Sequence, residues 1–380
     1  MRITCLISCL LFLLSSFYAL SKPIPAVCIV PVADLISKKF SPEPGKTIKS
    51  MYQGIGQTND SNASVPFCRI TQLLYNEPVN IIQTVTSPFG DQVEIETEFW
   101  YLKQSPSGKK MIQNNRFWTL KENVCTLEDL KNYTKTSKTY VPETLEKHCE
   151  TTIVVLKNSW KCPKTDDLFS AGTRFVCLEK KTDGYLVTIF NAKTKKYDKA
   201  IIPKSVCLLE KKRSDTEKRK VLVELLEDWA HQNPPIPYVL GGTSTGDSTT
   251  EQWPHRGMDC SGLVRRACRI VGIPVTAVNS LSLLEYFKPL SENAAPENGD
   301  LIYWKGHIVF ITSTKRHLLI EARGKEFGYV HEIHFSRQLH NIRNIHDLMK
   351  AYRYTLPINR LDKNGKFYQN IKKVTLLNLI

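Results

Sequence analysis

The chain has 380 residues and 42% of them are hydrophobic, so it is long enough for two or three domains that each bury a core. Its formal net charge is +15, a balance that suits an anionic polymer, a membrane surface or nucleic acid as partner. The lysines and arginines form no run of four or more, and the densest clusters, Lys211-Lys212-Arg213 and Lys218-Arg219-Lys220, fit a solvated linker and the start of a helix. We therefore expect no nucleic-acid partner.

The first 21 residues have the pattern of a secretory signal peptide. Arg2 stands near the start, an apolar run extends from Leu6 to Leu20, and Ala19 and Ser21 supply the small residues of a cleavage site. The run is shorter than the roughly 20 apolar residues that a spanning helix requires, which favours cleavage over the alternative of an uncut membrane anchor. No other segment of the sequence is apolar enough to cross a membrane. We expect an exported protein, periplasmic or secreted, with no integral membrane segment after cleavage.

The number of cysteines is a second indication that the protein is exported. Two of the 11 cysteines, Cys5 and Cys9, lie in the predicted signal peptide. The mature protein would therefore carry an odd number of cysteines into an oxidising environment. One free catalytic thiol plus paired structural cysteines would give such a count, although the pairing is not readable from sequence. The sequence contains no C-x-x-C pair and no H-x-x-x-H cluster, so we expect no metal site and no cofactor.

The chain from residue 22 to about 211 reads as β-rich. Apolar stretches of four to eight residues alternate with turn-forming clusters such as Ser41-Pro42-Glu43-Pro44-Gly45. Many short strands with polar turns favour small β-barrels over a parallel sheet. The length favours two such domains, over residues 22–147 and 148–211. The clearest predicted strands cover residues 27–30, 79–85, 93–96 and 185–190.

Around residues 214–232 the apolar spacing changes to that of a helix, which Pro234-Pro235 ends. A polar loop then leads to a second predicted helix, from Cys260 to about Val271. Strands are expected at 301–304, 307–313, 318–322 and 330–335. One or two helices followed by an antiparallel sheet make an α+β domain over residues 215–356. Residues 357–380 are expected to form a basic, loosely ordered tail.

Cys260 is the most informative residue of this last domain. It stands in the run Met258-Asp259-Cys260-Ser261-Gly262-Leu263-Val264, where a thiol, two small residues and an apolar-periodic segment indicate the first turn of a helix. Backbone N–H groups and the helix dipole favour negative charge there, and therefore the thiolate, the nucleophilic form of cysteine. We predict that Cys260 is the nucleophile of a cysteine hydrolase, with its own backbone N–H helping to hold the oxyanion.

A cysteine hydrolase also needs a base and a polar group that orients the base. His307 is the best candidate base, because it opens a predicted strand after a Lys-Gly turn, whereas His255 lies in the polar loop. His331 and the histidines that follow it are expected at the surface. Glu321 stands in an apolar strand, where a carboxylate is costly unless it has a partner. We expect Glu321 to orient His307, and the alternative is a solvent-facing glutamate on an edge strand.

The ordered set of motifs resembles the NlpC-type bacterial cell-wall peptidases. The set consists of Tyr238-x-x-Gly241-Gly242, Asp259-Cys260-Ser261-Gly262-Leu263, Gly299-Asp300-Leu301 and Gly306-His307-Ile308, and it covers about residues 215–356. The resemblance implies a papain-like fold with Cys260 as nucleophile and His307 as base. It further implies that Tyr238, Asp259 and Ser261 shape the site and bind the peptide.

The β-rich half resembles one branch of that family, in which two bacterial SH3-like domains precede the peptidase. Residues 71–79, Thr-Gln-Leu-Leu-Tyr-Asn-Glu-Pro-Val, look like a signature of the first such domain, and Ala171-Gly172-Thr173-Arg174-Phe175 resembles part of the second. The resemblance implies cleavage between γ-D-glutamate and a diamino acid in cell-wall peptides. It also implies that the first SH3-like domain narrows the cleft and selects a free N-terminal L-alanine.

Three positions depart from the family's pattern. Leu240 replaces a tryptophan in Y-x-W-G-G, the segment after the nucleophile helix lacks an arginine, and the third polar residue is Glu321 instead of His, Asn or Gln. A carboxylate stabilises imidazolium and would raise the basicity of His307. The first expectation is therefore an exported peptidase of peptidoglycan or murein peptides. Two alternatives are an amidase or acyltransferase that uses the same Cys–His pair, and a non-enzymatic wall-binding protein with a decayed site.

Overall fold

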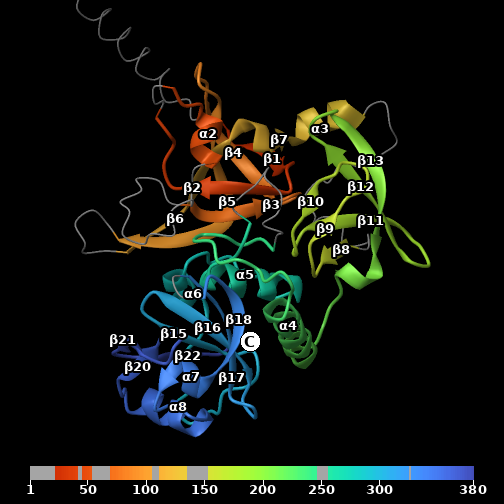
Figure 1. The fold of residues 1–380 in the computed structure, drawn as a ribbon. Coiled ribbons are helices and arrows are strands. Elements are labelled where there is room, and N and C mark those ends of the chain that lie inside the picture. The colour runs from red at the N-terminus through yellow and green to blue at the C-terminus, as the bar shows by residue number, and fades with distance from the viewer. Residues whose placement is uncertain are drawn as a thin grey trace, which may run out of the picture.

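A computed structural model describes residues 22–41, 45–53, 69–104, 111–134, 153–245, 256–324 and 327–380. The predicted signal peptide, residues 1–21, and His255 lie outside these residues. None of the helices in the described ranges is both long and apolar enough to cross a membrane. Figure 1 shows two β-rich parts side by side at one end of the molecule and a mixed α+β part at the other.

The first β-rich part is an antiparallel seven-stranded sheet in the order β3-β2-β6-β5-β4-β1-β7. Apolar side chains of alternate strand positions, among them Leu35, Ile95 and Phe117, are fully buried in its core. The predicted strands at 79–85 and 93–96 are confirmed, and the second extends much further than expected. The elements are β1 (Ile24–Cys28), β2 (Val32–Ile36), α2 (Ile48–Gln53), β3 (Arg69–Leu74), β4 (Pro78–Val85), β5 (Gln92–Gln104), β6 (Met111–Leu120), β7 (Val124–Thr126) and α3 (Leu127–Thr134).

The second β-rich part contains a five-stranded antiparallel sheet in the order β13-β12-β11-β8-β14 and a two-stranded sheet of β10 and β9. Trp160, Phe169 and Phe175 pack edge-to-face or stacked in its core. Tyr75 of the first part inserts into this cluster, and its hydroxyl accepts the Phe190 N–H at 2.7 Å. The strands are β8 (Ile153–Leu156), β9 (Trp160–Lys161), β10 (Leu168–Phe169), β11 (Arg174–Lys180), β12 (Gly184–Asn191), β13 (Lys196–Pro203) and β14 (Cys207–Leu209).

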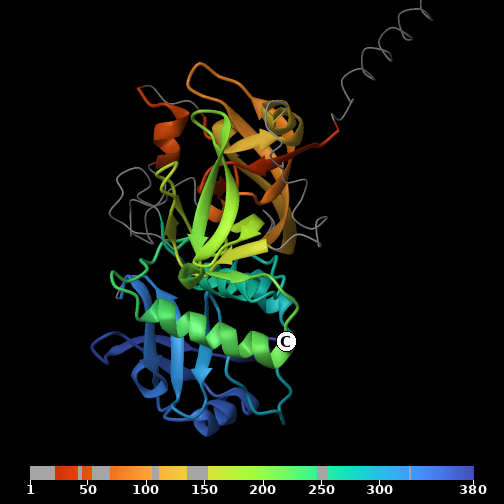
Figure 2. The ribbon, with the colours of Figure 1, turned by 90° about the vertical axis from the view of Figure 1, so that its right-hand side faces the viewer.

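The third part places helices α4 and α5 against an antiparallel sheet in the order β18-β17-β16-β15-β22. Helix α4 (Asp215–Ala230) starts at a capping box formed by Ser214 and Glu217, and α5 (Cys260–Ile270) lies between the sheet and the β-rich parts (Figure 2). All four strands predicted for this domain are present. The remaining elements are α6 (Ser280–Tyr286), β15 (Leu301–Trp304), β16 (His307–Ser313), β17 (Leu318–Arg323), β18 (Tyr329–His334), α7 (Phe335–Gln338), β19 (Leu339–His340) and α8 (Ile345–Arg353).

The C-terminal residues are ordered, so the expectation of a loose tail over 357–380 is wrong. Strand β22 (Thr375–Leu377) completes the main sheet beside β15, while β20 (Ile358–Leu361) and β21 (Phe367–Ile371) form a small sheet with β19. Ile358, Ile371 and Leu376 are buried in the core beneath the main sheet. These apolar residues anchor a segment whose exposed positions include basic residues and also Phe367 and Tyr368.

The predicted disulfides do not form among the described residues. The seven cysteines that this part of the chain includes are all free and buried: Cys28, Cys125, Cys162, Cys177, Cys207, Cys260 and Cys268. Six of them pack as small apolar side chains in the cores, which explains their presence without pairing.

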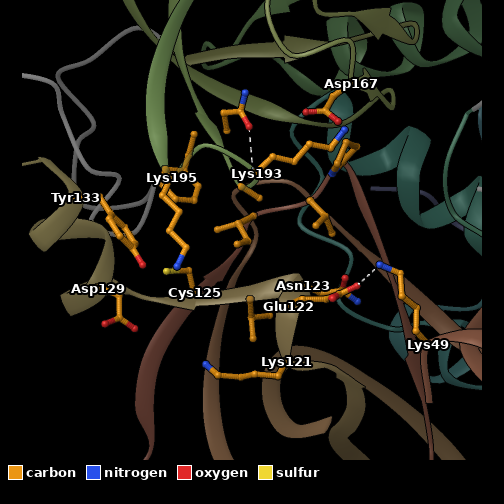
Figure 3. A pocket seen from close by; sticks show the side chains of 17 residues that line it. Lys49, Lys121, Glu122, Asn123, Cys125, Asp129, Tyr133, Asp167, Lys193 and Lys195 are labelled. Carbon is orange, nitrogen blue, oxygen red and sulfur yellow. Dashed lines mark hydrogen bonds and ion pairs between the residues drawn. The ribbon is translucent and has the colours of Figure 1, made fainter. Parts of the chain in front are cut away.

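A pocket of about 850 Å³ lies between the two β-rich parts (Figure 3). Its lining combines Asn123 and Cys125 of the first part with Phe190, Lys193 and Lys195 of the second. Cys260 does not line it, so this pocket is separate from the predicted catalytic residues.

Candidate active site

Asp259 is the N-cap of helix α5 and organises the chain around Cys260. One carboxylate oxygen accepts the Gly262 N–H at 2.6 Å and the Ser261 hydroxyl at 2.8 Å, and the other accepts the Gly241 N–H at 2.8 Å. Burial raises the pKa of Asp259, and these three hydrogen bonds oppose that shift because they favour the charged form. The motifs 238–242 and 259–263 are therefore joined through one side chain.

Gly262 allows the two motifs to lie against each other. A Cβ atom at this position would lie 1.9 Å from the carbonyl oxygen of Gly242, and the same oxygen accepts the Asp259 N–H at 3.1 Å. No side chain larger than hydrogen fits between helix and loop. The small residue that follows the Cys-Ser pair is therefore required by backbone packing.

The thiol of Cys260 is buried and lies beside the start of strand β16. Cys260 belongs to the same buried cluster as Ile308, the residue that follows His307. The pKa of Cys260 is raised to about 12, mainly by burial and next by the negative charge of Asp259, although the Ile308 N–H and the charge of Arg360 oppose the shift. The resting cysteine is therefore a thiol, because burial outweighs the helix start that was expected to favour the thiolate.

His307 is the first residue of β16 and is bonded to Glu321. Its Nε2 lies 2.5 Å from Oε2 of Glu321, which leaves Nδ1 as the ring nitrogen available to a thiol. The pKa of His307 is lowered to about 4, mainly by burial and next by the charge of Arg360, although the hydrogen bond and charge of Glu321 oppose the shift. In the resting site the imidazole is neutral.

Glu321 is completely buried on β17, so the alternative of a solvent-facing glutamate is excluded. Besides His307, its Oε2 accepts hydrogen bonds from Gln338 Nε2 and Arg360 Nη2, each at 3.1 Å. Its Oε1 lies 3.3 Å from His331 Nε2 and 3.9 Å from Arg323 Nη1. Burial alone would raise the pKa of Glu321, but the hydrogen bond from His307, the adjacent His331 and the charges of His307 and Arg360 hold it well below its usual range. The carboxylate is ionised.

His331 corrects an expectation, because it is buried and not a surface residue. Strand β18 pairs with β17 so that His331 lies directly opposite Glu321, and side chains opposite each other share a face of the sheet. The ring of His331 also stacks on Phe327 at 4.0 Å with an interplanar angle of 7°. Register between two strands, which the sequence does not reveal, decides this position.

Tyr238 is half-buried and packs beside Gly324, where a Cβ atom would lie 2.9 Å from its ring. Burial raises the pKa of its hydroxyl, and the charges of Asp259 and Cys260 act in the same direction. Those two charges act on Tyr238 because the structure brings it to the same site. Leu240 is 58% exposed. The peptide-binding roles of Tyr238, Asp259 and Ser261 stay predictions.

The two motifs of the β-rich half lie against helix α5. Arg265 Nη2 donates to Thr71 Oγ1 at 2.5 Å, and Arg266 Nη1 donates to Glu77 Oε1 at 3.0 Å. Gly172, with φ +88°, lies so close to Arg266 that a Cβ atom would be 2.4 Å from Cδ of that arginine. Residues 71–79 and 171–175 are therefore contact surfaces for the helix that carries Cys260.

The two β-rich parts, which contact α5, also hold the loop that follows the segment Tyr238 to Gly242. The Thr243 N–H donates to Gln72 Oε1 at 2.8 Å, and the Thr245 N–H donates to Ser170 Oγ at 2.8 Å. Each β-rich part thus holds one end of residues 243–245. Sequence reasoning found the motifs and missed Arg265 and Arg266, whose only signal is that they belong to three arginines on a helix of otherwise small and apolar residues.

Residues 236–353 match the model of the NlpC/P60 family, so this part of the chain is an NlpC/P60 domain. Among solved structures, an NlpC/P60 family protein from Bacillus cereus ATCC 10987 is similar over 82% of this chain and 94% of its own, with a TM-score of 0.54 and 16% identity. This likeness shows a shared fold over most of the chain. No curated protein matches it.

Two further solved structures are similar to a smaller degree. An NlpC/P60 endopeptidase from Photobacterium damselae subsp. piscicida has a TM-score of 0.46 and 10% identity, over 81% of this chain and 64% of its own. The peptidoglycan hydrolase RipB from Mycobacterium tuberculosis has a TM-score of 0.27 and 18% identity, over 43% of this chain and 66% of its own.

Proposed function

We propose that this protein is a cysteine peptidase that hydrolyses peptidoglycan stem peptides with Cys260, His307 and Glu321. One observation carries the proposal: the buried Cys260 belongs to the same core cluster as Ile308, which directly follows a histidine whose Nε2 is held 2.5 Å from a buried carboxylate. A nucleophile, a base and an orienting group are the three parts that a cysteine hydrolase requires. The NlpC/P60 domain match over the same residues supports this chemistry.

Both reacting groups are neutral at rest, because burial raises the pKa of Cys260 and lowers that of His307. The thiol proton therefore moves to His307 as the sulfur attacks the peptide carbonyl, and a thiolate need not exist beforehand. His307 then gives the proton to the leaving amine, and a thioester remains on Cys260. Water hydrolyses the thioester, with backbone N–H groups at the start of α5 stabilising each oxyanion.

The bond that we propose for cleavage joins γ-D-glutamate to a diamino acid, as the resemblance to the SH3-containing branch implies. The two β-rich parts are taken as SH3-like domains, the first of which narrows the cleft and selects a free N-terminal L-alanine. The contacts of Thr71 and Glu77 with α5 support this arrangement, because they hold the first part rigidly beside the catalytic helix. An exported location, after removal of residues 1–21, belongs to the same proposal.

Incubation of residues 22–380 with L-Ala-γ-D-Glu-diaminopimelate and with intact sacculi tests the function, with products identified by mass spectrometry. We expect release of L-Ala-D-Glu from the free peptide by the wild type and none by Cys260→Ala. Cys260-dependent release at another bond would replace the peptidase by an amidase or acyltransferase. Equal products from both forms would eliminate every enzymatic function at this site.

A further inference from the structure

Arg360 lies on β20, beyond the residues that match the NlpC/P60 domain, and still reaches the catalytic carboxylate. Its side chain is 7% exposed, and Nη2 lies 3.1 Å from Oε2 of Glu321. The same oxygen bonds to His307. Arg360 and His307 therefore share one carboxylate oxygen, and the charge of the arginine is placed beside the base.

Two aromatic rings fix the guanidinium in this position. Its central carbon lies 5.0 Å from the ring centre of Trp304 and 5.8 Å from that of Tyr368, which is on β21. Trp304 in turn packs against His307, with ring centres 5.0 Å apart. Cation–π contacts of this kind hold an arginine in a defined orientation and keep its charge in place. Figure 1 shows β20 and β21 beside the main sheet.

We propose that Arg360 is a positioning residue of the catalytic site, which orients Glu321 toward His307 and places a fixed positive charge beside Cys260 and His307. The proposal rests on the proposed function only in taking these two residues as the reacting pair. A fixed positive charge stabilises a developing thiolate and disfavours a premature imidazolium. The C-terminal strands would thus complete a catalytic site whose other members lie in the NlpC/P60 domain.

Other charged and titratable groups face the same cluster and must be held constant in a test. They are Arg323 on β17, His331 on β18, Asp259 at the start of α5, Tyr238 before it and Tyr368 on β21. Because these groups remain in every variant below, a change in the pKa of His307 or in the reactivity of Cys260 is attributable to position 360. Removal of the positive charge of Arg360 shifts the pKa values of both reacting groups in the same direction: the pKa of Cys260 and the pKa of His307 rise.

The test compares the wild type with Arg360→Met, Arg360→Gln and Arg360→Lys, each as residues 22–380. Two readouts need no peptide substrate: the NMR titration of His307, and the rate at which iodoacetamide alkylates Cys260 at pH 8, with Cys260→Ala as background. Lys366→Met is the matched control, because it removes an exposed positive charge from the turn between β20 and β21.

In the methionine and glutamine variants, we expect the pKa of His307 to rise by about one unit. We expect iodoacetamide to alkylate Cys260 about tenfold more slowly in the same variants. The lysine variant and Lys366→Met should stay near the wild type in both readouts. A merely loosened site would expose Cys260 and speed alkylation, which overturns the proposal, as does an unchanged titration in a folded variant. If Arg360→Met does not fold, Arg360→Gln, which keeps a donor to Glu321, decides the question.

Peptide hydrolysis by the same proteins separates this inference from the proposed function. Arg360→Gln should lower kcat and leave KM near the wild-type value, because Arg360 acts through Glu321. If the wild type cleaves no cell-wall peptide, the proposed function fails while the titration and alkylation results still decide the role of Arg360.

Discussion

Arg266 on the nucleophile helix and Glu77 of the first β-rich part form a buried ion pair, 3.0 Å apart and separated by 189 positions in the sequence. The Arg266 side chain is fully buried and also donates to the Thr243 carbonyl at 3.0 Å. The charge of Arg266, together with those of Arg265 and Arg269, holds the pKa of Glu77 below its usual value although burial opposes this. The position of α5, and with it Cys260, depends on a residue from another domain.

Glu77→Ala should therefore destabilise the protein by about 3–5 kcal/mol, because it leaves the Arg266 charge buried without its partner. Urea unfolding measures this, and Glu128→Ala, on an exposed position of α3, is the matched control. The double variant Glu77→Met/Arg266→Met should be more stable than Glu77→Ala, because it buries no unpaired charge. A Glu77→Ala protein as stable as the control would show that the pair is unimportant.

Glu321→Gln should lower kcat by about 100-fold or more with little change in KM. The amide keeps the shape of the side chain but removes the negative charge that balances Arg360 and stabilises the imidazolium of His307. Steady-state kinetics on the tripeptide measures the effect, and Glu285→Gln, at an exposed position of α6, serves as control. Unchanged kcat in a folded Glu321→Gln protein would remove the carboxylate from the mechanism.

Stability should fall as the pH falls from 7, and His307 supplies the first part of the loss. Its pKa is about 4 in the folded protein against an ordinary 6.5, so between these values the unfolded chain binds the extra proton and the folded state loses stability, on the order of 3 kcal/mol in all. His307→Gln should flatten the dependence of Tm on pH between about 7 and 5, whereas His340→Gln, at an exposed position, should not. Parallel curves for all three proteins would contradict the lowered pKa.

Below the ordinary carboxyl pKa of 4.5 the loss should steepen, because Glu77 and Glu321 both have lowered pKa values in the folded protein. Such groups stabilise the fold above the unfolded pKa, and this stabilisation disappears as the pH falls through the folded pKa. Glu77→Gln should lower stability at pH 7 and reduce its change from pH 5 to pH 3. Thermal unfolding across this range measures both effects, and a steeper slope in the variant would overturn the assignment.

Gly262→Ala should destabilise the protein by about 3 kcal/mol or prevent folding, because the new Cβ would overlap the Gly242 carbonyl oxygen and push α5 away from the loop. Ser261→Ala is the neighbouring comparison, since it loses one hydrogen bond to Asp259 and about 1 kcal/mol without any overlap. Unfolding midpoints for the two variants measure the difference. Equal losses would mean that the helix and loop move apart easily.

The sequence by itself determined the local features of the last domain. The apolar spacing of residues 221–229 predicted α4, and the start of α5 at Cys260 follows from Asp259 capping the first turn, an interaction within three residues. The strands over 301–304 and 307–313 have the predicted bounds, because each is an apolar segment between turn residues. Such features depend on neighbours in the chain, and sequence reasoning reaches them. The SH3-like identity of the β-rich parts and the signal peptide stay predictions.

Only the tertiary structure decided which charges surround the reacting pair. Arg360 reaches Glu321 across 39 positions, from residues expected to be a loose tail, and His331 faces Glu321 because of the register of β17 and β18. The resting protonation states of Cys260 and His307 are likewise set by burial, which raises one pKa and lowers the other. Burial and strand register arise when distant segments pack together, and no local pattern of residues encodes them.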